Sequence, residues 1–205
     1  MSILFRYKRG FSLFELLVSM AIVAVLMRVV LFDYSKFNDN ISLSSAGQEV
    51  AIAIRQAQTY GLNVQEVSSG SGLFSAAYGI YFDPTNSPNN YYIFADTNKN
   101  AGDKVGVYDV GSGCGSANTE CVQTNNLRGG ITISAICNGS GCPPGASTRA
   151  MHVTFLRPNP DADINFTNSG GIKTFAGQST GKVRLLSPKG KTLDVVVEST
   201  GQIAI

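Results

Sequence analysis

The sequence is poor in the residues and motifs on which many enzymes depend. It contains one histidine, His152, among 205 residues. No serine or cysteine nucleophile motif accompanies this histidine, because no Gly-x-Ser-x-Gly segment stands in the strand–turn–helix context that such a nucleophile requires. We therefore expect His152 to be an ordinary core or surface residue, and we expect the protein not to be an enzyme.

Charge is also scarce and balanced. Charged residues make up 15% of the chain, with 16 Lys and Arg against 14 Asp and Glu, for a net charge of +2. The two signs are scattered along the sequence, so this balance does not call for nucleic acid or for an acidic partner. With 43% hydrophobic residues, the composition suits one globular domain preceded by a long N-terminal element.

Proline is absent between Phe11 and Asn63. We expect a helix over residues 11–67, ended by the Ser/Gly-rich segment 68–72, and such a helix would extend for about 80 Å. Its first part, residues 11–32, is apolar all round and long enough to cross much of a bilayer. Its second part is amphipathic, with an apolar stripe formed by Ala46, Val50, Ala53, Ile54, Ala57, Tyr60 and Val64.

One carboxylate interrupts the apolar segment. Glu15 follows a basic leader that ends in Lys8-Arg9-Gly10. A charged group at membrane depth is costly, so an acid without a partner in its own segment suggests that another molecule supplies the partner. A secretory signal peptide is disfavoured because the apolar run ends near Phe32, too far from a small-x-small site at Ala46. A plain membrane anchor would gain nothing from Glu15.

The N-terminal segment resembles the class III signal sequence of type IV pilins and type II secretion pseudopilins. The resemblance rests on Lys8-Arg9-Gly10 followed by Phe11-Ser-Leu-Phe-Glu15-Leu-Leu-Val. It implies that a prepilin peptidase removes residues 1–10 by cutting after Gly10 and methylates the new N-terminal Phe11. It also implies that Glu15 pairs with the Phe11 amine of a neighbouring subunit in a filament.

The same resemblance implies a fold and a set of partners. The fold is α+β, the pilin fold, in which the long N-terminal helix packs on a C-terminal domain of antiparallel β-sheet. The partners are other pilin or pseudopilin subunits, the prepilin peptidase and an assembly platform in the inner membrane.

Residues 68–205 are expected to form the exported β-rich domain. Short runs of β-branched and aromatic residues, bounded by turn residues, predict its strands. These runs are 78–83, 91–95, 105–110, 131–136, 151–157, 182–186, 192–198 and 202–205. Segments 187–190 and 199–201 suit tight turns, so the last three strands should form an antiparallel meander.

The end of the sequence, from Lys182 to Ile203, is similar to the end of the globular domain in pseudopilins of the GspH/FimT type. This second resemblance favours a minor subunit with two packed β-sheets over a major pilin.

Four cysteines lie in Gly/Ser/Asn-rich sequence of the exported domain: Cys114, Cys121, Cys137 and Cys142. An even number of cysteines in an exported domain indicates two disulfides. The sequence leaves their pairing open, and we prefer Cys114 with Cys121 and Cys137 with Cys142 because these pairs close two short loops. A tetrahedral zinc site is the alternative, although the usual Cys-x-x-Cys spacing is missing.

Segment 96–103 places oxygen ligands at alternate positions, as a calcium ion requires. The candidate ligands are Asp96, Asn98, Asn100 and Asp103. The segment is not an EF-hand, because its glycine comes one place late and no glutamate closes the loop. The alternative is a hairpin turn whose Asn and Asp side chains bond their own backbone. Calcium is the only cofactor that the sequence suggests.

A group of cations near the C-terminus offers a candidate DNA-binding surface, since FimT-type minor pilins can act in DNA uptake through basic residues in this region. The group consists of Lys182, Arg184, Lys189 and Lys191, which could contact several phosphates. However, Asp194 and Glu198 lie on the same hairpin and no aromatic residues interleave with the cations. A charge-mixed, solvated surface is the alternative.

The sequence thus predicts a structural subunit, a minor pilin or pseudopilin that assembles from the inner membrane into a type IV pilus or a type II secretion pseudopilus. The precursor would span the inner membrane once with a cytoplasmic N-terminus, following the positive-inside rule. The mature chain would stand in a periplasmic pseudopilus or an extracellular pilus. The alternatives are a binding module at the filament tip for DNA, an exported protein or a surface, and a major pilin.

Overall fold

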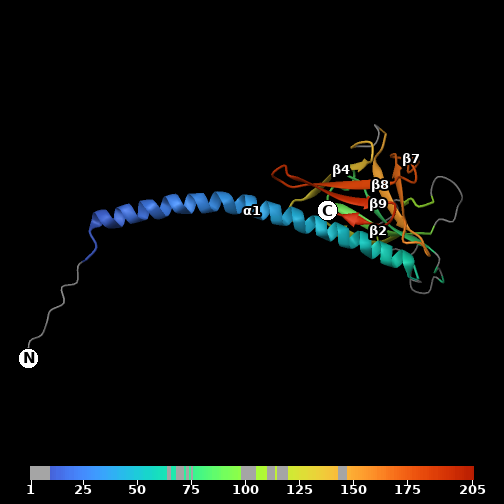
Figure 1. Ribbon diagram of the computed structural model, residues 1–205, viewed down its shortest axis with the longest axis horizontal. Helices are drawn as coiled ribbons and strands as arrows, with labels where there is room; N and C mark the ends of the chain where they lie inside the picture. Colours follow the sequence, from blue (N-terminus) through green and yellow to red (C-terminus); the bar gives the residue numbers. More distant parts are fainter. Residues whose placement is uncertain are drawn as a thin grey trace, which may run out of the picture. The chain divides into compact units, whose positions relative to one another are not determined.

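The computed structural model describes residues 10–63, 66, 67, 72, 74, 76–97, 105–109, 114, 120–142 and 147–205. Within these residues the chain forms one long helix followed by ten β-strands (Figure 1). The chain divides into two compact units, Met1–Asp39 and Asn40–Ile205.

Helix α1 (Leu13–Leu62) carries an acidic residue, Glu15, in its first turn, where a carboxylate interacts favourably with the helix dipole. The helix ends at Leu62, five residues before the expected end at residue 67. Gly61 weakens its last turn, and the carbonyl of Asn63 is taken by the Arg157 guanidinium at 3.3 Å. The helix therefore stops against the β-domain before it reaches the Ser/Gly-rich segment.

The strands follow in chain order, and their bounds are β1 (Ala77–Phe82), β2 (Asn90–Asp96), β3 (Cys121–Asn126), β4 (Thr132–Asn138), β5 (Ala150–Phe155), β6 (Ala162–Thr167), β7 (Lys173–Phe175), β8 (Thr180–Leu186), β9 (Thr192–Glu198) and β10 (Ile203–Ala204). They build a six-stranded sheet with the order β3-β2-β1-β5-β6-β7 and a four-stranded sheet with the order β10-β9-β8-β4. Every pairing between these strands is antiparallel. The architecture is thus α+β with two sheets.

The expected C-terminal meander is present as β8, β9 and β10. Gly190 closes the first turn with a positive φ of 81°, and its N–H donates to the carbonyl of Ser187 at 3.0 Å. Gly201 closes the second turn with the same φ, and its N–H donates to Glu198. Both turns need the left-handed conformation that glycine adopts without strain.

Three strands and one loop differ from expectation. β3, β6 and β7 are absent from the predicted set, because β3 reads as a polar segment, β7 is only three residues long, and the stretch before β6 is rich in Pro and Asp. Residues 105–109, predicted to be part of a strand, form a turn followed by irregular backbone. Gly106 adopts a φ of 73°, which lies outside the range of a β-strand.

One core joins the second half of α1 to both sheets. Its fully buried members include Val50 and Ile54 from α1, Phe82, Val153 and Phe155 from the larger sheet, and Val183, Leu185 and Val195 from the smaller one. Each of these side chains removes apolar area from water, which stabilises the fold by about 1.5–3 kcal/mol per large side chain. The amphipathic stripe predicted for the helix, from Ala46 to Tyr60, is the face that meets this core. The last predicted member, Val64, lies outside the described residues.

Two glycines of α1 mark where the helix approaches the β-domain most closely. A Cβ at Gly61 would lie 2.4 Å from the carbonyl oxygen of Phe155, and a Cβ at Gly47 would lie 2.4 Å from a methyl group of Leu193. Gly47, which the sequence suggests is a weak point of the helix, is thus a packing position.

Candidate functional site: the N-terminal segment and the surfaces of the β-domain

The first described residues form a short extended lead into α1. Gly10, Phe11 and Ser12 precede the helix, and the N–H of Leu16 donates to the carbonyl of Ser12 at 3.1 Å. Glu15 therefore stands one turn from the residue predicted to become the N-terminus.

Apolar side chains surround Glu15 on the helix surface. Phe11 is 78% exposed and Leu13 is 83% exposed, and Phe14, Leu16 and Leu17 are exposed as well. Glu15 itself is exposed. This unit presents a carboxylate within an apolar surface that its own residues do not cover.

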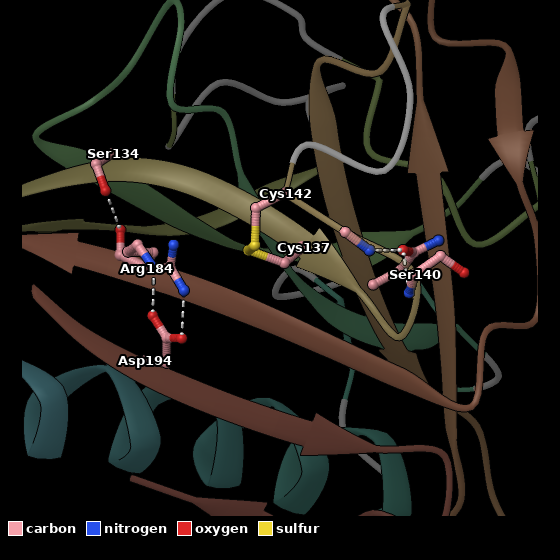
Figure 2. Close-up of a disulfide and its surroundings, with 8 residues drawn as sticks. Ser134, Cys137, Ser140, Cys142, Arg184 and Asp194 are labelled. Carbon is pink, nitrogen blue, oxygen red and sulfur yellow. Dashed lines mark hydrogen bonds and ion pairs between the residues drawn. A yellow bond between two sulfur atoms is a disulfide. The ribbon is translucent and has the colours of Figure 1, made fainter.

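The four cysteines form two disulfides in the β-domain. Cys114 is bonded to Cys121 at the start of β3, with the Cα atoms 4.7 Å apart. Cys137, near the end of β4, is bonded to Cys142, with the Cα atoms 4.2 Å apart (Figure 2). This is the pairing that we preferred from the sequence. Among the described residues, no group of three His, Cys, Asp or Glu side chains could hold a metal ion.

The candidate DNA-binding cations lie on and around the β8–β9 hairpin, where Arg184 and Lys191 bond to side chains of the same domain. The guanidinium of Arg184 donates from Nε and Nη2 to both carboxylate oxygens of Asp194, at 2.7 and 2.8 Å (Figure 2). These hydrogen bonds, and the charge of Arg184, lower the pKa of Asp194. The ammonium group of Lys191 donates to the side chain of Asn40. The hairpin is therefore a surface of mixed charge, and DNA binding stays a prediction.

The N-terminal segment matches a known sequence motif. A sequence model described as the prokaryotic N-terminal methylation motif matches residues 5–27. This match includes Gly10, Phe11 and Glu15, the residues on which the resemblance depends. The chain is type IV pilin-like. No curated protein and no solved structure matches it.

This motif bears on the anchoring, processing and assembly of the pilin-like chain. It indicates a membrane-anchored precursor that is processed by a prepilin peptidase and assembles with other pilin subunits. It points to a structural subunit rather than to an enzyme. In the part of the chain that the structure describes, no helix meets the length and hydropathy expected of a membrane span.

The predicted calcium ligands fall mostly outside the described residues. Asn98, Asn100 and Asp103 are not described, whereas Asp96 ends β2 and accepts a hydrogen bond from the N–H of Gly106 at 2.7 Å. The carboxylate of Asp96 thus holds the turn at 105–106 of the pilin-like chain. Calcium binding stays a prediction.

A buried polar group that sequence reasoning missed is Glu120. Its carboxylate accepts hydrogen bonds from the N–H groups of Thr97 and Asp109, at 3.1 and 2.8 Å. Burial raises the pKa of Glu120, although these backbone donors partly offset the shift. Glu120 joins two loops beside the Cys121 disulfide, and no motif in the sequence signals this role.

His152 occupies a closed position on β5. It is 1% exposed, its Nδ1 accepts from the N–H of Tyr108 at 3.0 Å, and its Nε2 lies 2.9 Å from the hydroxyl of Thr167. The ring packs against Tyr81 and Phe94. Burial, with a smaller contribution from the charge of Lys173, lowers the pKa of His152 to about 3. His152 is a core residue of the pilin-like chain, one of the two positions expected from the sequence.

Proposed function

We propose that this chain is a structural subunit of a type IV pilus or of a type II secretion pseudopilus. Residues 11–32 hold the precursor in the inner membrane with the leader in the cytoplasm. The prepilin peptidase then cuts after Gly10 and methylates Phe11. The methylation motif at residues 5–27 is the observation that carries this proposal.

The exposed apolar surface of the first unit supports assembly. Phe11, Leu17 and Val25 are among its large side chains that are more than half exposed. In a bilayer this surface contacts lipid, and in a filament it contacts the corresponding segments of other subunits. Transfer from one apolar environment to the other costs little, so the same surface suits both states.

Glu15 gives the assembled state its register. In the filament its carboxylate meets the amino group of Phe11 on a neighbouring subunit, which removes the penalty of an unpaired acid among apolar side chains. A buried ion pair contributes little net stability compared with apolar contacts. Its role here is to fix the axial position of one subunit against the next.

We propose that this chain is a minor subunit of its filament. The four-stranded sheet ends in the β8–β9–β10 meander, whose sequence is similar to that of GspH/FimT-type pseudopilins. A six-stranded and a four-stranded sheet together agree with that type.

Mass spectrometry of the chain purified from its cell envelope tests the processing step. We expect a mature polypeptide that begins at Phe11 and carries one methyl group on its amine. A Gly10→Val variant should remain at the precursor mass, because the peptidase requires a small residue before the cut. A mature terminus at any other residue would exclude the proposed function.

Stoichiometry in sheared filaments separates the minor role from its alternatives. A minor subunit or tip-located module is present at a few copies per filament, whereas a major pilin makes up most of the filament mass. Quantitative mass spectrometry of sedimented filaments therefore decides between them. A protein that dominates the filament mass would contradict the minor role and leave the processing result intact.

A further inference from the structure

A cleft with a volume of about 190 Å³ opens on the larger sheet of the β-domain. Its walls are the turn after β1 and the turn after β6, and its floor includes the buried His152. Its lining also includes the polar residues Asn86, Arg149, Asn168 and Ser169. The site is separate from the N-terminal segment and from the β8–β9 hairpin.

The acid that lines this cleft is Asp83, and both of its carboxylate oxygens already accept two hydrogen bonds each. Its Oδ1 accepts from the N–H groups of Thr85 and Asn86, at 2.8 and 2.9 Å. Its Oδ2 accepts from the hydroxyl of Tyr81 at 3.1 Å and from the amide of Asn86 at 2.7 Å. Four hydrogen bonds thus hold the carboxylate of Asp83 and fix the turn as one wall of the cleft.

The ring of His152, on the floor of the cleft, also has its hydrogen-bonding atoms paired. Both ring nitrogens of His152 have partners, in the N–H of Tyr108 and the hydroxyl of Thr167. A ligand therefore gains no hydrogen bond from this ring. The group that remains available is the guanidinium of Arg149.

The guanidinium of Arg149 has a hydrogen-bond donor without a partner among the described residues. Its Nη2 donates to the neutral side-chain oxygen of Asn86, while its Nε is buried and has no hydrogen-bond partner among the described residues. Within the same residues no carboxylate forms an ion pair with it. A buried donor without a partner is unfavourable, so a ligand that accepts from it stabilises the site.

The same chain shows what satisfies this edge of an arginine. Arg184 uses its Nε and Nη2 together to hold both oxygens of Asp194. This planar fork matches a carboxylate and is stronger than a bond to a neutral amide. In Arg149 the Nη2 atom of the corresponding edge donates to the neutral oxygen of Asn86, while the buried Nε atom has no hydrogen-bond partner among the described residues.

We propose that the cleft binds a small ligand through one carboxylate group, which takes the Nε and Nη2 edge of Arg149 in place of the Asn86 side-chain oxygen. The cleft volume limits the ligand to about the size of one sugar acid or one terminal amino-acid residue. The hydroxyl of Tyr81 and the N–H groups of Thr85 and Asn86 do not depend on the Asn86 side chain, so these three donors stay on Asp83 and partly offset its repulsion of the incoming anion. The proposal is independent of filament assembly, because it concerns the β-domain alone.

The test is a titration of the full-length chain, labelled with ¹⁵N-arginine, in detergent micelles. The probes are two acids, glucuronate and N-acetylalanine, and their neutral counterparts, glucose and N-acetylalaninamide. We expect one or both acids to shift the Nε–H signal of Arg149 while the signal of Arg184 stays in place. The acid that binds identifies the source of the carboxylate as a sugar or a chain end. The neutral counterpart should bind at least about tenfold more weakly.

Three variants make the assignment specific. Arg149→Gln should abolish acid binding, and Arg149→Lys, which keeps the charge but loses the fork, should weaken it about tenfold. Arg128→Gln removes an arginine from a different surface and should bind like the wild type. Equal responses to an acid and its neutral counterpart, unchanged affinity in Arg149→Gln, or no shift of the wild-type Arg149 signal with any probe would each overturn the proposal.

Discussion

At the scale of single residues, the sequence located the histidine and the structure determined its chemical state. A backbone N–H donates to Nδ1 of His152, so the neutral ring carries its proton on Nε2, toward Thr167. Protonation would turn Nδ1 into a donor facing another donor. The sequence could not predict this, since the partners on the 105–109 loop and on β6 come from segments whose structure was not correctly predicted.

The first prediction concerns the pH dependence of stability at His152. Its pKa is lowered to about 3 in the folded protein and is about 6.5 in the unfolded chain. The unfolded state therefore binds more protons between these values, so stability falls as the pH drops from 6.5 toward 3. Between pH 7 and pH 5 we expect the free energy of unfolding to fall by about 2 kcal/mol from this group.

A His152→Asn variant isolates the effect, because Asn keeps an acceptor for Tyr108 but does not titrate. Urea unfolding of both proteins at pH 7 and pH 5, followed by near-ultraviolet circular dichroism, provides the comparison. Glu120 and the other carboxylates are common to both proteins, so the difference between the two pH dependences comes from His152. Equal slopes with pH in the two proteins would contradict the assigned role of His152.

The second prediction contrasts two glycines of α1. A methyl group at Gly61 would meet the backbone carbonyl of Phe155, whereas at Gly47 it would meet the flexible end of Leu193. Gly61→Ala should destabilise the protein by about 2 kcal/mol, because a strand must shift. Gly47→Ala should stay within about 1 kcal/mol of the wild type, because the gain in helix propensity offsets the movement of Leu193. Thermal unfolding of the two variants tests this order, and the reverse order would refute the packing account.

At the scale of elements, apolar periodicity predicted what packs against the core. Helix α1 and seven strands with β-branched or aromatic residues were anticipated from such patterns. β3, with the sequence Cys-Val-Gln-Thr-Asn-Asn, was missed because it is a partly exposed edge strand and lacks the apolar alternation that marks a half-buried strand. Residues 105–109 were wrongly predicted to be part of a strand because a turn at Gly106, held by Asp96, overrides the propensity of Val105, Val107 and Tyr108.

The third prediction concerns the two disulfides. Each closes a short loop, with sequence separations of 7 and 5 residues, so each should contribute about 2 kcal/mol by restricting the unfolded chain. One begins β3 of the larger sheet and the other lies at β4 of the smaller sheet. Because the two do not share a sheet, their contributions should add.

Urea unfolding of the Cys114→Ala/Cys121→Ala variant, the Cys137→Ala/Cys142→Ala variant and the quadruple variant measures both quantities. We expect losses of about 2, 2 and 4 kcal/mol. A quadruple variant no less stable than either double variant would show that the two loops are coupled.

At the scale of the whole molecule, the sequence predicted two parts with different surroundings, and the structure divides the chain at Asp39 and Asn40. In the first part, the large apolar side chains that the structure describes are exposed. The second part has a core built from α1 and both sheets. The candidate assembly residues could be predicted because they form a contiguous motif, whereas the Arg149 cleft could not, because it combines residues from separate turns.

The last prediction tests the assembly role of Glu15 in the complete chain. Glu15→Gln keeps the shape of the side chain and removes its charge, so membrane anchoring should be unchanged or slightly stronger. Pairing with the Phe11 amine of a neighbour would be lost, and an unpaired amine among apolar side chains is costly. We therefore expect at least about a tenfold reduction of this chain in sheared filaments, which corresponds to a loss of about 1.4 kcal/mol or more.

A matched control is Ser19→Ala, which lies one turn further along α1 and changes a side chain that donates to the carbonyl of Leu16. This variant should be processed, anchored and assembled normally. Carbonate extraction of membranes measures anchoring, and immunoblots of sheared filaments measure assembly. If Glu15→Gln enters filaments as well as Ser19→Ala does, the ion pair does not set the register, and apolar contacts along the helix must do so instead.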